Sequence, residues 1–173
     1  MQIPDHTNTC NHDTDLPVGS LVIEEPVTVL TNILLASVCF WVYRRIKREL
    51  SGHPVNRLYA RFFLVMSAAT LLGGIFGHAF CGTLGIAWKL PGWLLSMVAV
   101  MFAERASIVH TGQVLPSGLL AFFRWMNIAE LLVLVTLTLA SLNFFFVEFH
   151  AFYGFVGVVG VFESWHLYKT GNK

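Results

Sequence analysis

The sequence predicts an all-α fold: a polytopic membrane helix bundle of five transmembrane helices, with the N-terminus outside and the C-terminus inside. Its composition is strongly apolar, with 55% hydrophobic residues, 12% charged residues and a mean hydropathy of +0.66, whereas about 25% of the residues in soluble domains are charged. Several segments approach the roughly 20 apolar residues that a helix needs to cross a hydrocarbon core. The basic residues gather on one side of these segments, as they do in membrane proteins.

The five predicted spans follow one another without a linker long enough to separate two domains. They cover residues 26–43, 62–80, 91–103 with a less apolar continuation to 110, 119–142 and 144–167. The third span is the least regular, because Glu104 and Arg105 fall where its inner end is expected. We therefore expect one transmembrane domain at residues 26–173, preceded by a separate segment at residues 1–25.

Residues 1–25 are expected to form a short, mostly disordered acidic tail on the extracytoplasmic side. The segment contains aspartates and glutamates but no Lys or Arg, and it lacks the basic start and apolar core of a cleavable signal peptide. Because no positive charge hinders its transfer across the membrane, the first span is expected to act as an uncleaved anchor.

The basic residues predict the orientation. Six of the 11 Lys and Arg residues lie between the first two spans, and with the N-terminus outside only Lys89 of the 11 lies on the outer side. This is a strong positive-inside pattern. We expect a multi-pass protein of the cell membrane or an inner membrane, whose basic loop contacts anionic lipid head groups. Membrane lipids are the expected partners, a homo-oligomer or a partner helix is left open, and nucleic acid is not expected.

Cysteine and glycine give two further expectations. Cys10, Cys39 and Cys81 form no CxxC pair, so we expect three free thiols, with a pair between Cys10 and Cys81 as the alternative. Glycines recur in the second and fifth spans, where small residues allow helix backbones to approach closely. We expect these two helices to form the bundle interior and to pack through a set of four glycines: Gly74, Gly77, Gly154 and Gly157.

Polar residues at membrane depth are candidates for function, because burying them in lipid is costly unless they have a partner. Helical spacing and topology bring a set of polar residues to a similar depth near the outer side: Glu24 or Glu25, Asn32, His78, Glu148 and His150. Two imidazoles with a carboxylate can bind a divalent metal, so His78, His150 and Glu25 are expected metal ligands and zinc the cofactor to consider. Asn32 is expected to orient an imidazole from outside the ligand set. The alternative is that both histidines are interfacial residues hydrogen-bonded to water or a neighbouring helix.

A second polar group is expected at the inner ends of the helices. It includes Glu104, His110, Glu163 and His166, with Asn127 and Glu130 deeper in the membrane. Glu163 and His166 are three residues apart and could form a hydrogen-bonded pair, but the favoured interpretation is an interfacial pair beside Trp165. Glu130 lies well inside the membrane, where it must be buried, protonated or paired.

Two segments resemble a known family: EEPVTVLTN at the start of the first span and GGIFGHAF at the end of the second. They are similar to the N-terminal part of the alkaline ceramidase and progestin-and-adipoQ-receptor superfamily of seven-helix intramembrane metal hydrolases. The resemblance covers about the first 95 residues and implies that His78 is a zinc ligand, with Glu25 and Asn32 at the family's polar positions in the first helix. The chain departs from the family where ceramidases carry a serine and an aspartate, because it has Gly74 and Lys89 there.

Three functions follow from these observations. The first is a metal-dependent hydrolase of a lipid amide or ester, or a degenerate or partial relative of one. The second is a non-enzymatic membrane protein, such as a receptor, a transporter subunit or an assembly factor. The third, a haem-binding electron carrier, is disfavoured because His150 and His166 are 16 residues apart, which turns their side chains about 160° from one another on a helix.

Overall fold

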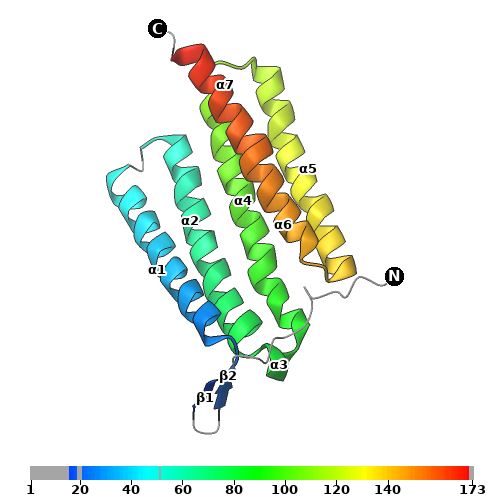
Figure 1. Ribbon diagram of the computed structural model, residues 1–173. Helices are drawn as coiled ribbons and strands as arrows, with labels where there is room; N and C mark the ends of the chain where they lie inside the picture. Colours follow the sequence, from blue (N-terminus) through cyan, green and yellow to red (C-terminus); the bar gives the residue numbers. More distant parts are fainter. Residues whose placement is uncertain (1–15, 19–20, 51, 172–173) are drawn as a thin grey trace.

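The computed structural model describes residues 16–18, 21–50 and 52–171, which form an all-α bundle with one small β-hairpin (Figure 1). Five helical segments are long and apolar enough to cross a membrane: Pro26–Glu49, Pro54–Ala79, Ile86–Thr111, Ser117–Ser141 and Phe145–Thr170. The five predicted spans are therefore confirmed at this level. Most of the predicted acidic tail lies outside the described residues.

The spans are built from α-helices and from two π-helical segments. The first span is α1 (Pro26–Glu49), and the second is α2 (Pro54–Leu72) continued by the π-helix η1 (Gly73–Ala79). Two short helices, α3 (Cys81–Leu84) and η2 (Ile86–Lys89), lead into α4 (Leu90–Thr111). Next comes α5 (Ser117–Ser141), and the fifth span comprises α6 (Phe145–Phe152), the π-helix η3 (Tyr153–Val159) and α7 (Gly160–Thr170).

Proline marks the start of three of these helices. Pro26, Pro54 and Pro91 occupy the first or second position of α1, α2 and α4, where the missing N–H costs no helical hydrogen bond. At α2 the side chain of His53 also accepts a hydrogen bond from the backbone N–H of Val55 at 3.3 Å. These local signals explain why each helix begins where it does.

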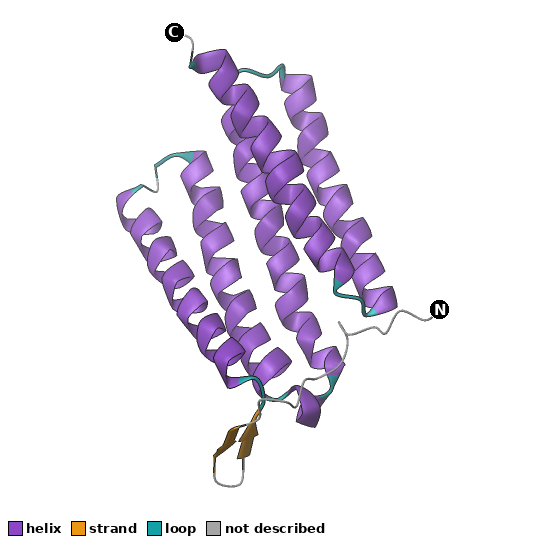
Figure 2. Cartoon of the chain, viewed as in Figure 1, coloured by secondary structure: helices purple, strands orange, loops and turns teal. Residues whose placement is uncertain are grey.

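The end of the predicted tail is an ordered hairpin. Strand β1 (Leu16–Val18) pairs antiparallel with β2 (Leu21–Ile23), with Leu16 opposite Ile23. These residues are an ordered part of a tail that was expected to be mostly disordered, because leucine, isoleucine and valine flanking a Gly-Ser pair favour a short hairpin. The hairpin and α3 lie at one end of the bundle, while the α1–α2 turn, the α4–α5 loop and the end of α7 lie at the other (Figure 2).

Helix α4 is the centre of the bundle. It packs against α2 on one side and against α5 and the fifth span on the other (Figure 1). In the apolar part of the third span, to which α4 belongs, 33% of the residues are buried, compared with 22% in the second span and 17% in the fifth. The third span continues past Glu104 to Thr111, in agreement with its predicted continuation to residue 110. Small residues such as Ala99, Ala103 and Ala106 let neighbours approach α4 closely.

The glycines do not join the second span to the fifth, so that expectation is wrong. A Cβ at Gly74 would lie 2.8 Å from the Cβ of Asn32 on α1, and one at Gly154 would overlap Glu104 on α4. The contacts of Gly77 are with Lys89, and those of Gly157 are with its own helix. Each span uses its glycines to approach its own neighbour, because the two helices lie on opposite sides of α4.

The cysteines also differ from expectation. Cys81 is disulfide-bonded, whereas Cys39 is free and buried, so the expectation of three free thiols is wrong for Cys81. The alternative pairing with Cys10 involves a residue outside the described part of the chain. Cys81 begins α3 at the hairpin end, while Cys39 lies within α1.

Candidate functional site

The residues that sequence analysis selected lie in two polar clusters, and the first is a hydrogen-bonded pair near the β-hairpin. His78, in the π-helix η1, places Nδ1 2.9 Å from Oε2 of Glu25, the residue that caps the start of α1. The predicted contact between the first span and His78 is therefore present. Asn32 lies close by and lines a small cavity of about 150 Å³ together with His78 and Lys89.

The neighbouring Glu24 has a different role. Both of its carboxylate oxygens accept hydrogen bonds from the backbone N–H of Gly82, at 2.9 and 2.7 Å. Its own backbone N–H donates to the carbonyl of Ala79 at 3.1 Å. These bonds tie the end of the hairpin to α3 and leave Glu25 to reach His78, a choice that the sequence left open.

His150 belongs to the second cluster, away from His78. Its Nε2 lies 3.8 Å from Oε1 of Glu104 and 3.8 Å from Oε1 of Glu130. The predicted ligand set of His78, His150 and Glu25 is thus not assembled, because α6 packs against α4 and α5 rather than against α1. Glu104, which the sequence placed at the inner ends, instead meets Glu130 and His150.

The acid–imidazole cluster, as we name Glu104, Glu130 and His150, is fully buried at two of its residues, while the side chain of Glu130 is 18% exposed. Glu104 and His150 are both 0% exposed, and one ligand-capable atom of each of the three residues lies within 4.8 Å of the others. Among the described residues, Oε1 of both glutamates and both ring nitrogens of His150 have no hydrogen-bond partner. Leaving buried polar atoms unpaired is costly, so this cluster is a candidate binding site.

A chain of hydrogen bonds orients Glu104. Arg105 donates from Nε to Oδ1 of Asn127 at 2.9 Å and from its guanidinium to the carbonyl of Arg124 at 2.8 Å. Because arginine can only donate, the amide oxygen of Asn127 must face Arg105 and its NH₂ group must face Glu104. This NH₂ group donates to Oε2 of Glu104. The other oxygen, Oε1, is thereby turned toward Glu130 and His150.

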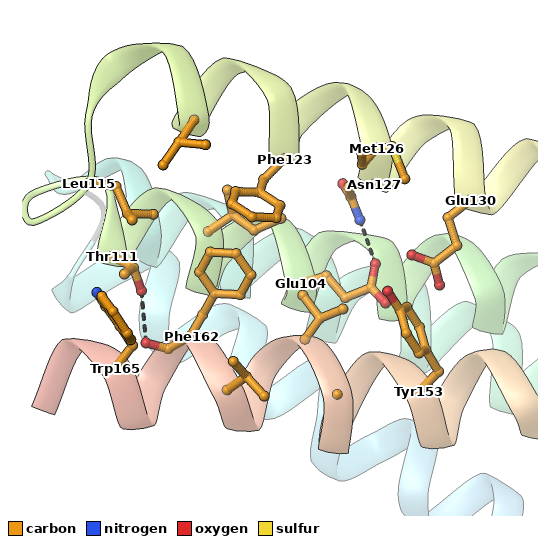
Figure 3. Close-up of a pocket in the computed structure, with 15 residues that line it drawn as sticks. Glu104, Thr111, Leu115, Phe123, Met126, Asn127, Glu130, Tyr153, Phe162 and Trp165 are labelled. Carbon is orange, nitrogen blue, oxygen red and sulfur yellow. Dashed lines mark hydrogen bonds between the residues drawn. The ribbon is translucent and has the colours of Figure 1, made fainter. Parts of the chain in front are cut away.

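A cavity of about 450 Å³ runs from the acid–imidazole cluster toward the α4–α5 loop (Figure 3). Its polar end carries Glu104, Asn127, Glu130 and Tyr153, and Figure 3 shows their side chains gathered there, away from Trp165 at the opposite end. The rest of the lining is mainly apolar: Ile108, Leu115, Leu119, Phe123, Met126, Val158, Val161 and Phe162. The cavity thus lies between α4, α5 and the fifth span.

The remaining polar residues that were predicted at the inner helix ends form a separate group. His110 pairs with Glu163, with Nδ1 2.9 Å from Oε2, and stacks on His166 with ring centroids 4.0 Å apart. Glu163 thus hydrogen-bonds to α4 rather than to His166 on its own helix. Thr111 completes this contact by donating to the carbonyl of Phe162 at 3.0 Å. The group joins the end of α4 to the fifth span, at the end of the bundle opposite the β-hairpin.

Sequence reasoning missed Tyr153 and the hydrogen bonds through Asn127. It identified Glu104, Glu130 and His150 individually, but assigned Glu104 and His150 to opposite ends of the bundle. The depth of Glu130 within the predicted fourth span was the available signal, whereas Glu104 fell at the predicted inner end of the third span. Their shared partner depends on which helices are neighbours, and hydropathy carries no information on that point.

Comparison with protein-family models matches residues 27–173 to the family described as "Family of unknown function (DUF6962)". No curated protein and no solved structure matches the chain.

Proposed function

Since the chain belongs to DUF6962, a family of unknown function, its role has to be inferred from its own cavity, and we propose that it is an integral membrane protein that binds a single-chain amphiphile inside the bilayer. The observation that carries this proposal is the cavity with one polar and one apolar end. Its volume of about 450 Å³ lies within the roughly 300–1,000 Å³ of small-molecule sites.

The cavity opens sideways, toward the region that lipid would occupy. Four of its lining residues remain well exposed on the apolar surface of the bundle: Leu119, Met126, Val161 and Trp165. Helix α5 packs against α6 near the short loop that connects them. The cavity lies farther from this loop, between α5 and α7. A ligand dissolved in the bilayer can therefore enter without crossing water.

The lining favours one hydrocarbon chain with a hydrogen-bond donor. Phe123 and Phe162 line the cavity from α5 and α7 and touch edge to face, with ring centroids 5.0 Å apart. This contact narrows the cavity between α5 and α7. At the polar end the carboxylates of Glu104 and Glu130 are acceptors. A ligand with a hydroxyl or an amide N–H satisfies them, while its chain contacts the apolar residues.

The same proposal includes the orientation of the chain. The basic residues of the α1–α2 turn lie at the end of the bundle that also carries the end of α7 (Figure 1). The positive-inside rule assigns this end to the cytoplasm. The hairpin and the pair of Glu25 and His78 then face the outer side.

Photoaffinity labelling tests the binding. The full chain in lipid nanodiscs is irradiated with a long-chain fatty alcohol that carries a diazirine, and the labelled peptides are mapped. We expect labels on α5 and α7 around Phe123 and Phe162, and several-fold less labelling in Val158→Trp, which fills the cavity. The matched control is Val133→Trp on the lipid-facing side of α5, where Val133 is exposed. Equal labelling of both variants would refute the proposal.

Hydrolysis of a bound lipid ester or amide is a second candidate function. It is favoured by the meeting of two carboxyl groups and an imidazole at the end of the cavity, because such groups can remove a proton from water and pass it to a leaving group. A receptor or transporter subunit would use the same cavity for binding alone.

Turnover separates these two classes. Purified protein is incubated with long-chain esters and amides, and the released alcohol, amine and fatty acid are measured. A hydrolase should lose its turnover in Glu130→Gln and keep it in Glu148→Gln, because Glu148 is exposed and lines no part of the cavity. Ligand binding without turnover by the unsubstituted chain would assign the protein to the non-enzymatic class.

A further inference from the structure

We propose that the acid–imidazole cluster is a divalent-metal site, with Oε1 of Glu104, Oε1 of Glu130 and Nε2 of His150 as its three protein ligands. The site goes beyond amphiphile binding and does not depend on it. It differs from the set predicted from sequence, because it keeps His150 but contains neither His78 nor Glu25.

The distances between the three ligand atoms fit a single ion. Nε2 of His150 is 3.8 Å from each of the two carboxylate oxygens, and the three residues each offer one ligand atom within 4.8 Å of the other two. Atoms bound tetrahedrally at about 2.1 Å from a metal are about 3.4 Å apart. Small rotations of the two glutamate side chains are sufficient to reach this separation.

Hydrogen bonds within the described structure do not explain the cluster. A proton on Oε1 of either glutamate would remove its charge, but neither Oε1 has an acceptor within hydrogen-bond distance, so an O–H at that atom would remain unpaired. Two ionised carboxylates at this depth would repel each other in a medium of low dielectric constant. A divalent cation balances both negative charges and also takes up the free electron pair of the imidazole.

The surroundings hold one ligand oxygen in place. Asn127, itself held by a hydrogen bond from Arg105, donates to Oε2 of Glu104 and leaves Oε1 free. Gly154 lies against the same oxygen, where a Cβ would overlap it. It is part of a fifth span that turns into the π-helix η3 at Tyr153, and π-helical turns are frequent at functional sites. This is the outer support that metal ligands commonly have.

The ligand set indicates the kind of metal. An imidazole nitrogen disfavours magnesium and calcium, which prefer oxygen ligands, and suits first-row transition metals such as zinc and manganese. Three protein ligands leave a coordination position open, as in catalytic zinc sites. Glu104 and Glu130 line the cavity (Figure 3), so the open position faces the space that the amphiphile would occupy.

Metal analysis of the full chain tests the site. The protein is purified in nanodiscs, stripped with a chelator, reloaded with Zn²⁺ or Mn²⁺ and washed, and its metal content is measured by mass spectrometry. We expect one ion per chain, and at least about a tenfold loss of affinity in Glu104→Gln, Glu130→Gln and His150→Gln. His78→Gln is the matched control, because it removes an imidazole that pairs with Glu25 at the other cluster, and it should bind metal normally.

A second measurement covers variants that fail to fold. Adding Zn²⁺ to the stripped, unsubstituted chain should raise its thermal unfolding temperature, because a ligand that binds only the folded state stabilises it. Cobalt in place of zinc should give the visible absorption of a four-coordinate site. A folded chain that takes up less than one tenth of an ion and shows no thermal shift would overturn the proposal, and so would equal metal loss in His78→Gln. Photoaffinity labelling of the stripped chain reports ligand binding separately, so a failure of either proposal is recognised on its own.

Discussion

Nε2 of His150 lies 3.8 Å from Oε1 of Glu104, although the two residues are separated by a complete transmembrane helix in the sequence. Both side chains are fully buried. The contact exists because α4 is the central helix and α6 packs directly on it. It links the interior of the bundle to the polar end of the cavity, so substitutions around it should affect both stability and binding.

The first prediction concerns Gly154. A Cβ at this position would overlap Oε1 of Glu104 and lie 2.5 Å from Cγ1 of Val100, so Gly154→Ala should lower the free energy of unfolding by about 1–3 kcal/mol. At Gly160 a Cβ would lie 3.4 Å from the nearest atom, the carbonyl oxygen of Phe155. Gly160→Ala is therefore the control and should be neutral or stabilising by up to about 1 kcal/mol. Denaturant unfolding in detergent measures both, and equal effects would contradict the packing of the fifth span against α4.

The second prediction concerns the contact between the first two spans. Gly74→Ala should destabilise the bundle by about 1–3 kcal/mol, because its Cβ would lie 2.8 Å from the Cβ of Asn32. Gly73 is the adjacent control, since a Cβ there meets nothing within 4 Å. Thermal unfolding of the two variants should differ clearly. If Gly73→Ala were the more destabilising of the two, the assignment of the Gly74 face of η1 to the contact with α1 would be contradicted.

The third prediction concerns the hydrogen bonds that hold Glu104. Asn127→Ala removes the acceptor of Arg105 and the donor to Glu104, and unpaired groups that remain buried cost about 1–3 kcal/mol each. We expect a loss of that order in the free energy of unfolding. Thr136→Ala is the control on the same helix, because its exposed hydroxyl bonds only to its own backbone, at Leu132, and it should change stability by less than about 0.5 kcal/mol. Similar values for both variants would show that Asn127 does not support the cluster.

The fourth prediction concerns the pair of His78 and Glu25. The two side chains are 31% and 18% exposed, so solvent screens their interaction, and a double-mutant cycle with Glu25→Gln and His78→Gln should give a coupling of no more than about 1 kcal/mol. This pair should therefore contribute less to stability than Asn127. A coupling several times larger would mean that the pair has a role beyond joining the first two spans.

The fifth prediction concerns orientation in the membrane. A cysteine in place of Gly52, in the α1–α2 turn, should be protected from an impermeant maleimide in intact cells and should react after the cells are permeabilised. Thr83→Cys, which is exposed at the opposite end of the bundle, is the control and should react in intact cells. The reverse pattern would place the basic turn outside and would contradict the positive-inside assignment.

The sequence by itself determined the number of helices and their approximate limits. Length, apolar composition and proline positions act locally, so each of the five spans was recognisable without reference to the others. The contact between Glu25 and His78 was also predictable, because consecutive spans usually pack together and the two residues lie at adjoining helix ends. The hairpin was missed because its two short strands were counted with the tail.

Only the tertiary structure decided which polar residues meet in the interior. His150 was a candidate from its depth, but its partners depend on α6 lying against α4 and α5, and the central position of α4 was not visible in its hydropathy. In lipid, helices gain little from apolar burial against one another, so their pairing depends on shape, on small residues such as Gly154 and on interhelical polar contacts. These are properties of two facing surfaces, and a single segment of sequence describes only one of them. The acid–imidazole cluster, which takes one residue from each of three helices, therefore emerged only when the helices were packed.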